Sequence, residues 1–208
     1  MSLSPALAAI VFMPAMAGLL FQVVQPHPWP HRLLAVALLL MSLEQAHMAR
    51  VDLQRGAAVE VRSRDPRLGH FRRVVILTIA GQVVGFSVAA LGHLGWGMAL
   101  ILLSLIGFNL AATIRVEPAG PRPIVAAGWR DRLDVLTLDA IALGLALLWM
   151  AQRLQGWVAG GLFAITLLYG TSKLFTYATA RRTGSSGLGS AVHIAHAAQE
   201  HPQPSQQN

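Results

Sequence analysis

Apolar residues are gathered into long runs that short polar stretches separate, and they do not alternate with polar residues along the chain. Most runs are close to the roughly 20 residues that an α-helix needs to cross the hydrocarbon core of a bilayer. The pattern therefore predicts an all-α, polytopic integral membrane bundle of about six transmembrane helices. The predicted spans are residues 4–24, 32–49, 74–93, 96–114, 133–151 and 157–180.

The two N-terminal runs each admit a second interpretation. No basic segment precedes the first run, and its apolar character continues past Ala15-Met16-Ala17, so a retained helix is expected rather than a cleaved signal peptide. In the second run the apolar part is only Leu33–Leu43, which is also compatible with a re-entrant or interfacial segment. This run spans the membrane fully only if Glu44 and His47 lie near its end.

The distribution of Lys and Arg predicts how the helices are oriented. Thirteen basic residues fall in loops 50–73 and 115–132 and at residues 181–182, against Arg32 and Arg153 in the opposite loops. Cytoplasmic loops carry the excess of Lys and Arg in membrane proteins, so both termini are expected in the cytoplasm, with the helices arranged as three antiparallel hairpins. Four tryptophans then lie at the outer interface: Trp29, Trp96, Trp149 and Trp157. Residues 1–180 form the predicted membrane domain, and 181–208 a flexible cytoplasmic tail.

Composition excludes several classes of protein. The chain has 208 residues, 54% hydrophobic and 12% charged, against about 25% charged in ordinary soluble domains. It contains no cysteine, which excludes disulfide scaffolds and thiolate chemistry. The net charge is +7, but no run of basic residues is interleaved with aromatic residues that could stack on bases, so no nucleic-acid partner is expected. The lipid bilayer is the expected partner, with other membrane subunits or a second copy as further partners. A bacterial-type inner (cytoplasmic) membrane, or an equivalent internal membrane, is the expected location.

Charged residues inside the predicted spans are the first candidates for function. Asp139 and Lys173 lie at similar depth on two sequential antiparallel helices. Ionisable residues within a bilayer are costly and usually face a partner or a water-filled cavity. The two side chains are therefore expected to form an ion pair, either one whose protonation or ligand exchange drives a function or one that holds the two helices together.

Other polar side chains lie mostly in the same predicted cytoplasmic half. Together they predict a cytoplasm-facing pocket for a small ligand, whereas interhelical hydrogen bonds are the alternative explanation for them. The candidate ligand-binding residues are Asp139, Lys173, Tyr169, Asn109, Glu44 and Gln82.

No metal or cofactor is expected. Glu44-x-x-His47 has the spacing found in di-iron helix bundles, but such sites need two of these motifs and two further glutamates. Glu44 and His47 are therefore only weak metal candidates.

These observations favour a protein that binds or transports a small solute or ion. The alternative is a structural or assembly subunit of a larger membrane complex without activity of its own. No catalytic residues are predicted, so an enzyme is the least favoured class, although it stays open.

Overall fold

The computed structural model describes residues 5–61, 63, 65–116 and 124–172, and the regular secondary structure within them is helical apart from one short β-hairpin. This confirms the predicted all-α class. The elements are α1 (Pro5–Val24), α2 (Trp29–Glu60), α3 (Pro66–Ala90), α4 (Leu94–Ala111), β1 (Ile114–Val116), β2 (Ile124–Ala126), the 3-10 turn η1 (Trp129–Arg132) and α5 (Leu133–Met150). Residues 155–172 are also helical.

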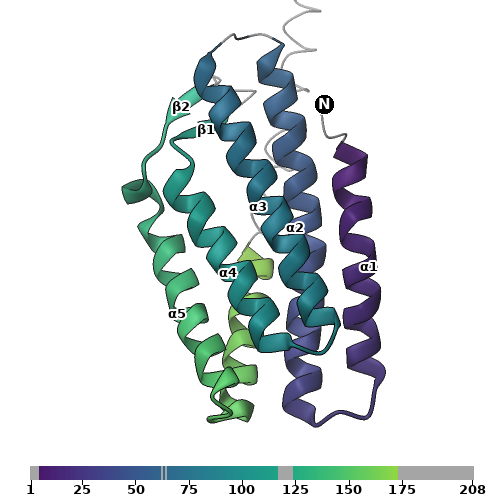
Figure 1. Cartoon of the computed structure of the whole chain (residues 1–208). Coiled ribbons are helices and arrows are strands. Elements are labelled where there is room, and N and C mark those ends of the chain that lie inside the picture. Colours follow the sequence, from purple (N-terminus) through teal and green to yellow (C-terminus); the bar gives the residue numbers. More distant parts are fainter. Residues whose placement is uncertain (1–4, 62, 64, 117–123, 173–208) are drawn as a thin grey trace, which may run out of the picture. The chain divides into compact units, whose positions relative to one another are not determined.

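The chain divides into two compact units, Met1–Thr166 and Leu167–Asn208. In the first unit α1 packs against α2 and α3, α3 packs against α4, and α4 packs against α5 (Figure 1). The α2–α3 connection and the β-hairpin lie at one end of this unit, here called the hairpin end. The α1–α2 and α3–α4 connections lie at the other. In the second unit, the described residues 167–172 are helical.

Four helices of the described chain are long and apolar enough to cross a membrane, which is consistent with the predicted membrane protein. They are Trp29–Glu60, Pro66–Ala90, Leu94–Ala111 and Trp129–Met150 among the described residues. These four coincide with the second to fifth predicted spans. The first predicted span, 4–24, falls on α1 (Pro5–Val24), within which Ile10–Val24 is an apolar helical segment. The last predicted span, 157–180, runs beyond the described residues.

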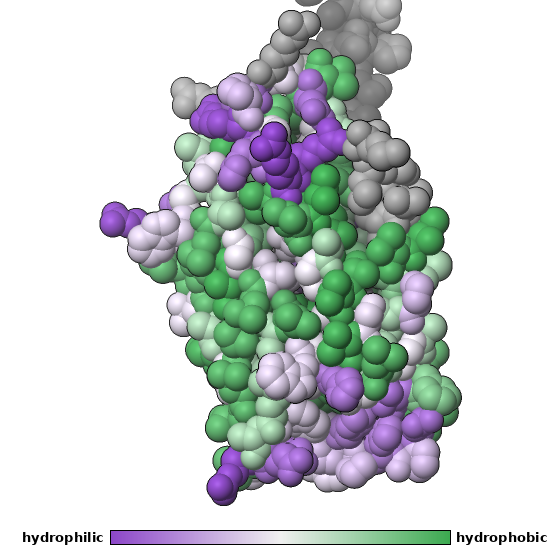
Figure 2. Space-filling model, viewed as in Figure 1, coloured by the Kyte–Doolittle hydropathy of each residue, from purple (hydrophilic) through white to green (hydrophobic). Residues whose placement is uncertain are grey.

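The surface of the first unit agrees with its membrane character. Figure 2 shows hydrophobic residues over the middle of the helices and hydrophilic residues near both ends. Several large apolar side chains along the helices are well exposed, among them Leu77, Val84 and Leu103. A soluble protein rarely exposes apolar side chains over so continuous an area, so this surface is suited to contact with lipid.

Helix α2 is longer than hydropathy predicted. It has 32 residues and ends at Glu60, whereas the apolar run ends at residue 49. A helix of this length is about 48 Å long at 1.5 Å per residue, against about 30 Å for the hydrocarbon core. Hydropathy detects only the part of a helix that lies in lipid, so the polar continuation of α2 was missed. Whichever part crosses the core, the helix extends well beyond it.

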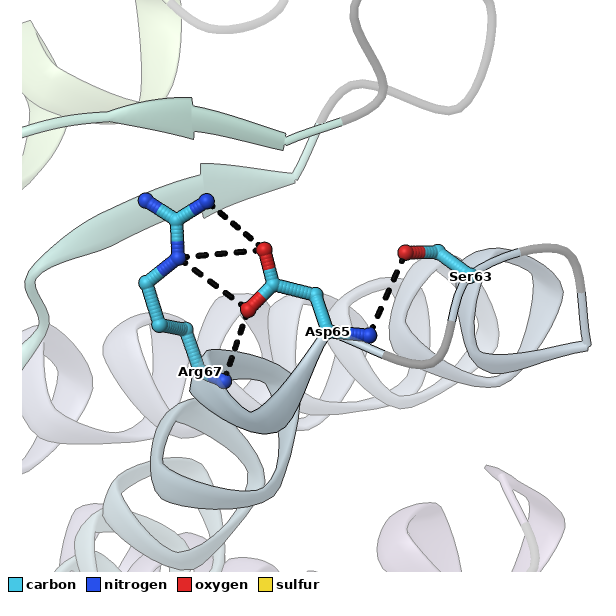
Figure 3. Close-up of polar contacts among 3 residues, drawn as sticks. All are labelled: Ser63, Asp65 and Arg67. Atoms are coloured by element: carbon cyan, nitrogen blue, oxygen red, sulfur yellow. Dashed lines mark hydrogen bonds and ion pairs between the residues drawn. The ribbon is translucent and has the colours of Figure 1, made fainter.

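Local chemistry at Asp65 explains where α3 begins. The Asp65 carboxylate accepts a hydrogen bond from the backbone N–H of Arg67 at 2.9 Å, and Pro66 occupies the first helical position. The Arg67 guanidinium bonds both carboxylate oxygens, and the Asp65 backbone N–H donates to Oγ of Ser63 (Figure 3). An aspartate cap followed by proline is a strong helix start, because it satisfies a free N–H and presets the backbone angle.

The core of the first unit depends on close contact between helices. The rings of Phe12 on α1 and Phe86 on α3 meet edge to face, with their centroids 5.8 Å apart. Gly85 on α3 and Gly97 on α4 lie opposite each other, and a Cβ added at Gly97 would lie 2.5 Å from the carbonyl oxygen of Gly85. Small residues permit such an approach of two backbones in membrane helices.

The β-hairpin lies where the fourth apolar run was expected to continue to residue 114. Helix α4 ends at Ala111 and the chain becomes extended at Ala112. β1 then pairs antiparallel with β2, with Ile114 opposite Ala126 and Val116 opposite Ile124. The β-branched residues at 114, 116, 124 and 125 favour a strand over a further helical turn.

Candidate functional site

Asn109 and Asp139 are two predicted site residues that the structure brings together. The side-chain amide nitrogen of Asn109, in the last turn of α4, donates to Oδ2 of Asp139 at 3.3 Å. Both side chains are buried, with 8% and 9% of their surface exposed. Asp139 lies two turns into α5, so this hydrogen bond joins two helices of the first unit.

Arg132 completes a chain of three polar side chains. Its guanidinium donates to Oδ1 of Asn109 at 3.5 Å and to the carbonyl oxygen of Ile114 at 3.3 Å. It also lies over the ring of Phe108, 5.2 Å from the ring centroid, which is a cation–π contact. Arg132 is only 8% exposed. Asn109 thus stands between a buried cation and a buried carboxylate, which we call the Asn109 cluster: Asn109, Arg132 and Asp139.

The charges on either side determine the orientation of the Asn109 amide. A carboxylate only accepts hydrogen bonds and a guanidinium only donates them. The NH2 group must therefore face Asp139, and the carbonyl oxygen must face Arg132. The opposite orientation would place like groups against each other at both contacts, so this arrangement follows from the chemistry of the neighbours.

The elements around Arg132 explain why an arginine is buried at this position. Arg132 ends η1, which begins where the backbone N–H of Gly128 donates to the Asp131 carboxylate at 2.8 Å. The chain enters this turn directly from the β-hairpin, whose first strand supplies the carbonyl oxygen of Ile114. The hairpin and the end of α4 together cover the guanidinium, whereas the neighbouring Arg130 is exposed over Trp129.

Gln82 forms an interhelical hydrogen bond, the alternative explanation for the polar side chains within the predicted spans. It is 2% exposed on α3, and its amide nitrogen donates to Oε1 of Gln45 on α2 at 2.8 Å. Gln45 was not a predicted site residue, although it follows Glu44. A short hydrogen bond between two uncharged amides supports packing of α2 on α3 more directly than it supports ligand binding.

The remaining predicted site residues lie away from the Asn109 cluster or outside the described residues. Glu44 is half-buried and His47 exposed on α2. Tyr169 belongs to the second unit, in the helical stretch that reaches residue 172. Lys173 lies outside the described residues, so the predicted Asp139–Lys173 pair and the Lys173 site are not tested. Within the described chain, no group of three or more His, Cys, Asp or Glu side chains is arranged to hold a metal ion.

Sequence reasoning missed two groups of residues. Arg132 was counted only among the basic loop residues that predict the orientation of the helices. Its burial depends on a β-hairpin that hydropathy does not detect. At the opposite end, Oε1 of Gln22 accepts a hydrogen bond from Nε2 of His31 at 3.2 Å, and the ring centroids of His27 and His31 are 4.2 Å apart. The spacing of four residues between these two histidines was the available signal in the sequence.

Comparison with known proteins adds no identity to this geometry: no family model, no curated protein and no solved structure matches the chain.

Proposed function

We propose that this multi-pass membrane protein binds or transports a small solute or ion at the Asn109 cluster. The observation that supports this proposal is the burial of a guanidinium and a carboxylate on opposite sides of one amide. Ionisable residues in membrane helices are rare and commonly mark ion or substrate pathways. Arg132 also lies near the carboxylates of Asp52 and Asp131. Asp139 accepts from Asn109, so the cluster offers a ligand both a cationic donor and an anionic acceptor.

The proposal includes the orientation of the chain. The hairpin end contains the basic connections, and we assign it to the cytoplasm by the positive-inside rule. Three antiparallel helical hairpins with both termini on that side complete the proposed six-span topology. The cluster then lies in the cytoplasmic half of the protein, and a bacterial-type inner membrane is the proposed location. The tail at 181–208 and the Asp139–Lys173 pair also remain parts of this proposal.

Currents from the reconstituted protein test the proposed function. Proteoliposomes on a solid-supported membrane receive concentration jumps of sodium, potassium, chloride, phosphate, acetate and ethanolamine. We expect a current with at least one of these solutes. In Asp139→Asn this current should fall at least about tenfold, because the substitution removes the charge of the cluster carboxylate and changes little else. Asp134→Asn, on the exposed face of the same helix, is the matched control and should behave as the wild type.

A second candidate function is that of an assembly subunit in a larger membrane complex. The observation that favours it is the internal satisfaction of Asn109, whose amide bonds both neighbours within the protein. Under this alternative, Asp139→Asn lowers thermal stability and none of the solutes gives a current. Proteins that co-purify with the chain in mild detergent, and are lost with it, would support the alternative.

A further inference from the structure

We propose that His27 and His31 form a binding site for a divalent transition-metal ion, with Zn²⁺ and Cu²⁺ as the chemically suited ions. This site lies at the α1–α2 connection, at the opposite end of the first unit from the Asn109 cluster (Figure 1). It is independent of the proposed function. Imidazole is the side chain that these ions bind most often in proteins.

The two imidazoles already lie within reach of one ion. Their ring centroids are 4.2 Å apart and the rings are tilted by 40°. Two metal–nitrogen bonds of about 2.0–2.1 Å allow the bonded nitrogens to lie up to about 4 Å apart. A rotation of the His27 ring would direct one of its nitrogens, together with Nδ1 of His31, toward a common ion.

Gln22 determines which nitrogen of His31 is available. The Gln22 amide nitrogen donates to the carbonyl oxygen of Ala90 at 3.1 Å, and that oxygen accepts only. The other end of the amide, Oε1, therefore faces Nε2 of His31 at 3.2 Å, and Nε2 must carry the proton. Nδ1 of neutral His31 then keeps its lone pair. Metal-binding histidines have this arrangement, in which the second ring nitrogen donates to a carbonyl group that orients the ring.

The surroundings suit a site reached from outside the bilayer. His27 lies in the connection before α2, and His31 lies in its first turn; both are half-buried. Arg32 is the nearest charged neighbour in sequence, and its Nε is held by the carbonyl oxygen of Val23 at 2.9 Å. Its side chain is exposed, so water screens its repulsion of a cation. Two side-chain ligands leave the other coordination positions to solvent.

Calorimetric titration of the full-length protein with ZnCl2 in detergent tests the site. The protein carries a tag without histidine, and His193, His196 and His201 are replaced by Gln in every variant, which removes three of the six other imidazoles of the chain. His47 and His70 are also replaced by Gln in every variant, and His93 serves as a control. We expect one Zn²⁺ per chain. His27→Ala and His31→Ala should each weaken binding at least about tenfold, and Gln22→Leu about tenfold or more through loss of ring orientation. His93→Ala, which removes an exposed histidine at the start of α4, should bind as the parent does.

The proposal is overturned if the parent protein binds no Zn²⁺, or if His27→Ala and His31→Ala bind it within twofold of the parent. A second measurement covers variants that do not fold. Diethyl pyrocarbonate modifies accessible imidazoles of the parent protein, and mass spectrometry locates them. Zn²⁺ should lower the modification of His27 and His31 and leave that of His93 unchanged; equal modification with and without Zn²⁺ also overturns the proposal.

Discussion

The amide nitrogen of Asn109 donates to the carboxylate of Asp139 across 3.3 Å, and this hydrogen bond joins the end of α4 to the beginning of α5. Its two partners are 30 residues apart in sequence and are both buried. Because a buried carboxylate needs hydrogen-bond donors, Asn109 is a structural requirement for Asp139 whatever ligand the cluster binds.

Removal of this donor should destabilise the protein. Asn109→Leu leaves the Asp139 carboxylate without its described donor, so we expect a loss of about 1–3 kcal/mol in the free energy of unfolding. The double variant Asn109→Leu/Asp139→Leu removes the orphaned group, and its loss should be smaller than the sum of the two single losses by about 0.5–3 kcal/mol. Unfolding in mixed micelles measures all four proteins; additive losses would contradict the contact.

The close approach of α3 and α4 predicts a strong effect at one glycine. A Cβ at Gly97 would lie 2.5 Å from the Gly85 carbonyl oxygen and 2.6 Å from the Cβ of Ala89. Gly97→Ala must therefore separate the two helices, at a cost of about 1–3 kcal/mol. At Gly107, on the same helix, an added Cβ meets no described atom within 4 Å, so Gly107→Ala should change stability by less than about 1 kcal/mol. Thermal unfolding in detergent compares the two variants, and equal effects would refute the packing.

The cap of α3 predicts a dependence on pH. Hydrogen bonds from the Arg67 side chain and backbone lower the pKa of Asp65 below its ordinary value. A carboxyl group whose pKa is lower in the folded state stabilises that state fully at pH values above its pKa in the unfolded chain. This stabilisation is lost as the pH falls through the folded pKa. The difference in melting temperature between wild type and Asp65→Asn should therefore be present at neutral pH and disappear in acid below the ordinary aspartate range. A difference that grows on acidification would have the wrong sign.

Asp65→Ala provides the control for capping without charge. Asparagine keeps an oxygen that accepts the N–H of Arg67, whereas alanine does not. Asp65→Ala should therefore lower the melting temperature more than Asp65→Asn does, and this gap between the two variants should depend little on pH.

The proposed topology predicts opposite accessibility at the two ends. The chain has no cysteine, so single cysteines at exposed positions report one site each. In intact cells, a membrane-impermeant maleimide should label Ala151→Cys and leave Ala57→Cys unlabelled, because we place the hairpin end in the cytoplasm. Both should react after the membrane is permeabilised. Labelling of both positions in intact cells, or the reverse pattern, would overturn the orientation.

Hydropathy identified the helical class and four of the spans, because a lipid-facing run can be recognised from the apolar residues of that segment alone. Its limits are clearest at α2, which continues to Glu60 in a polar sequence, and at the segment after Ala111, which forms a strand. In both places the apolar run and the helix end at different residues, because different physical properties set the two ends. The solubility of the side chains in lipid sets the end of the apolar run, and backbone hydrogen bonding sets the end of the helix.

The sequence by itself determined that the chain forms apolar helices long enough to cross a membrane, and it singled out Asn109 and Asp139 as polar residues within them. Only the tertiary structure decided which polar groups meet. It placed Arg132 against Asn109, paired Gln82 with Gln45, and brought His27 beside His31 under the control of Gln22. Hydropathy is a property of each segment alone, whereas a polar contact depends on the rotation of one helix against another and on what covers its end.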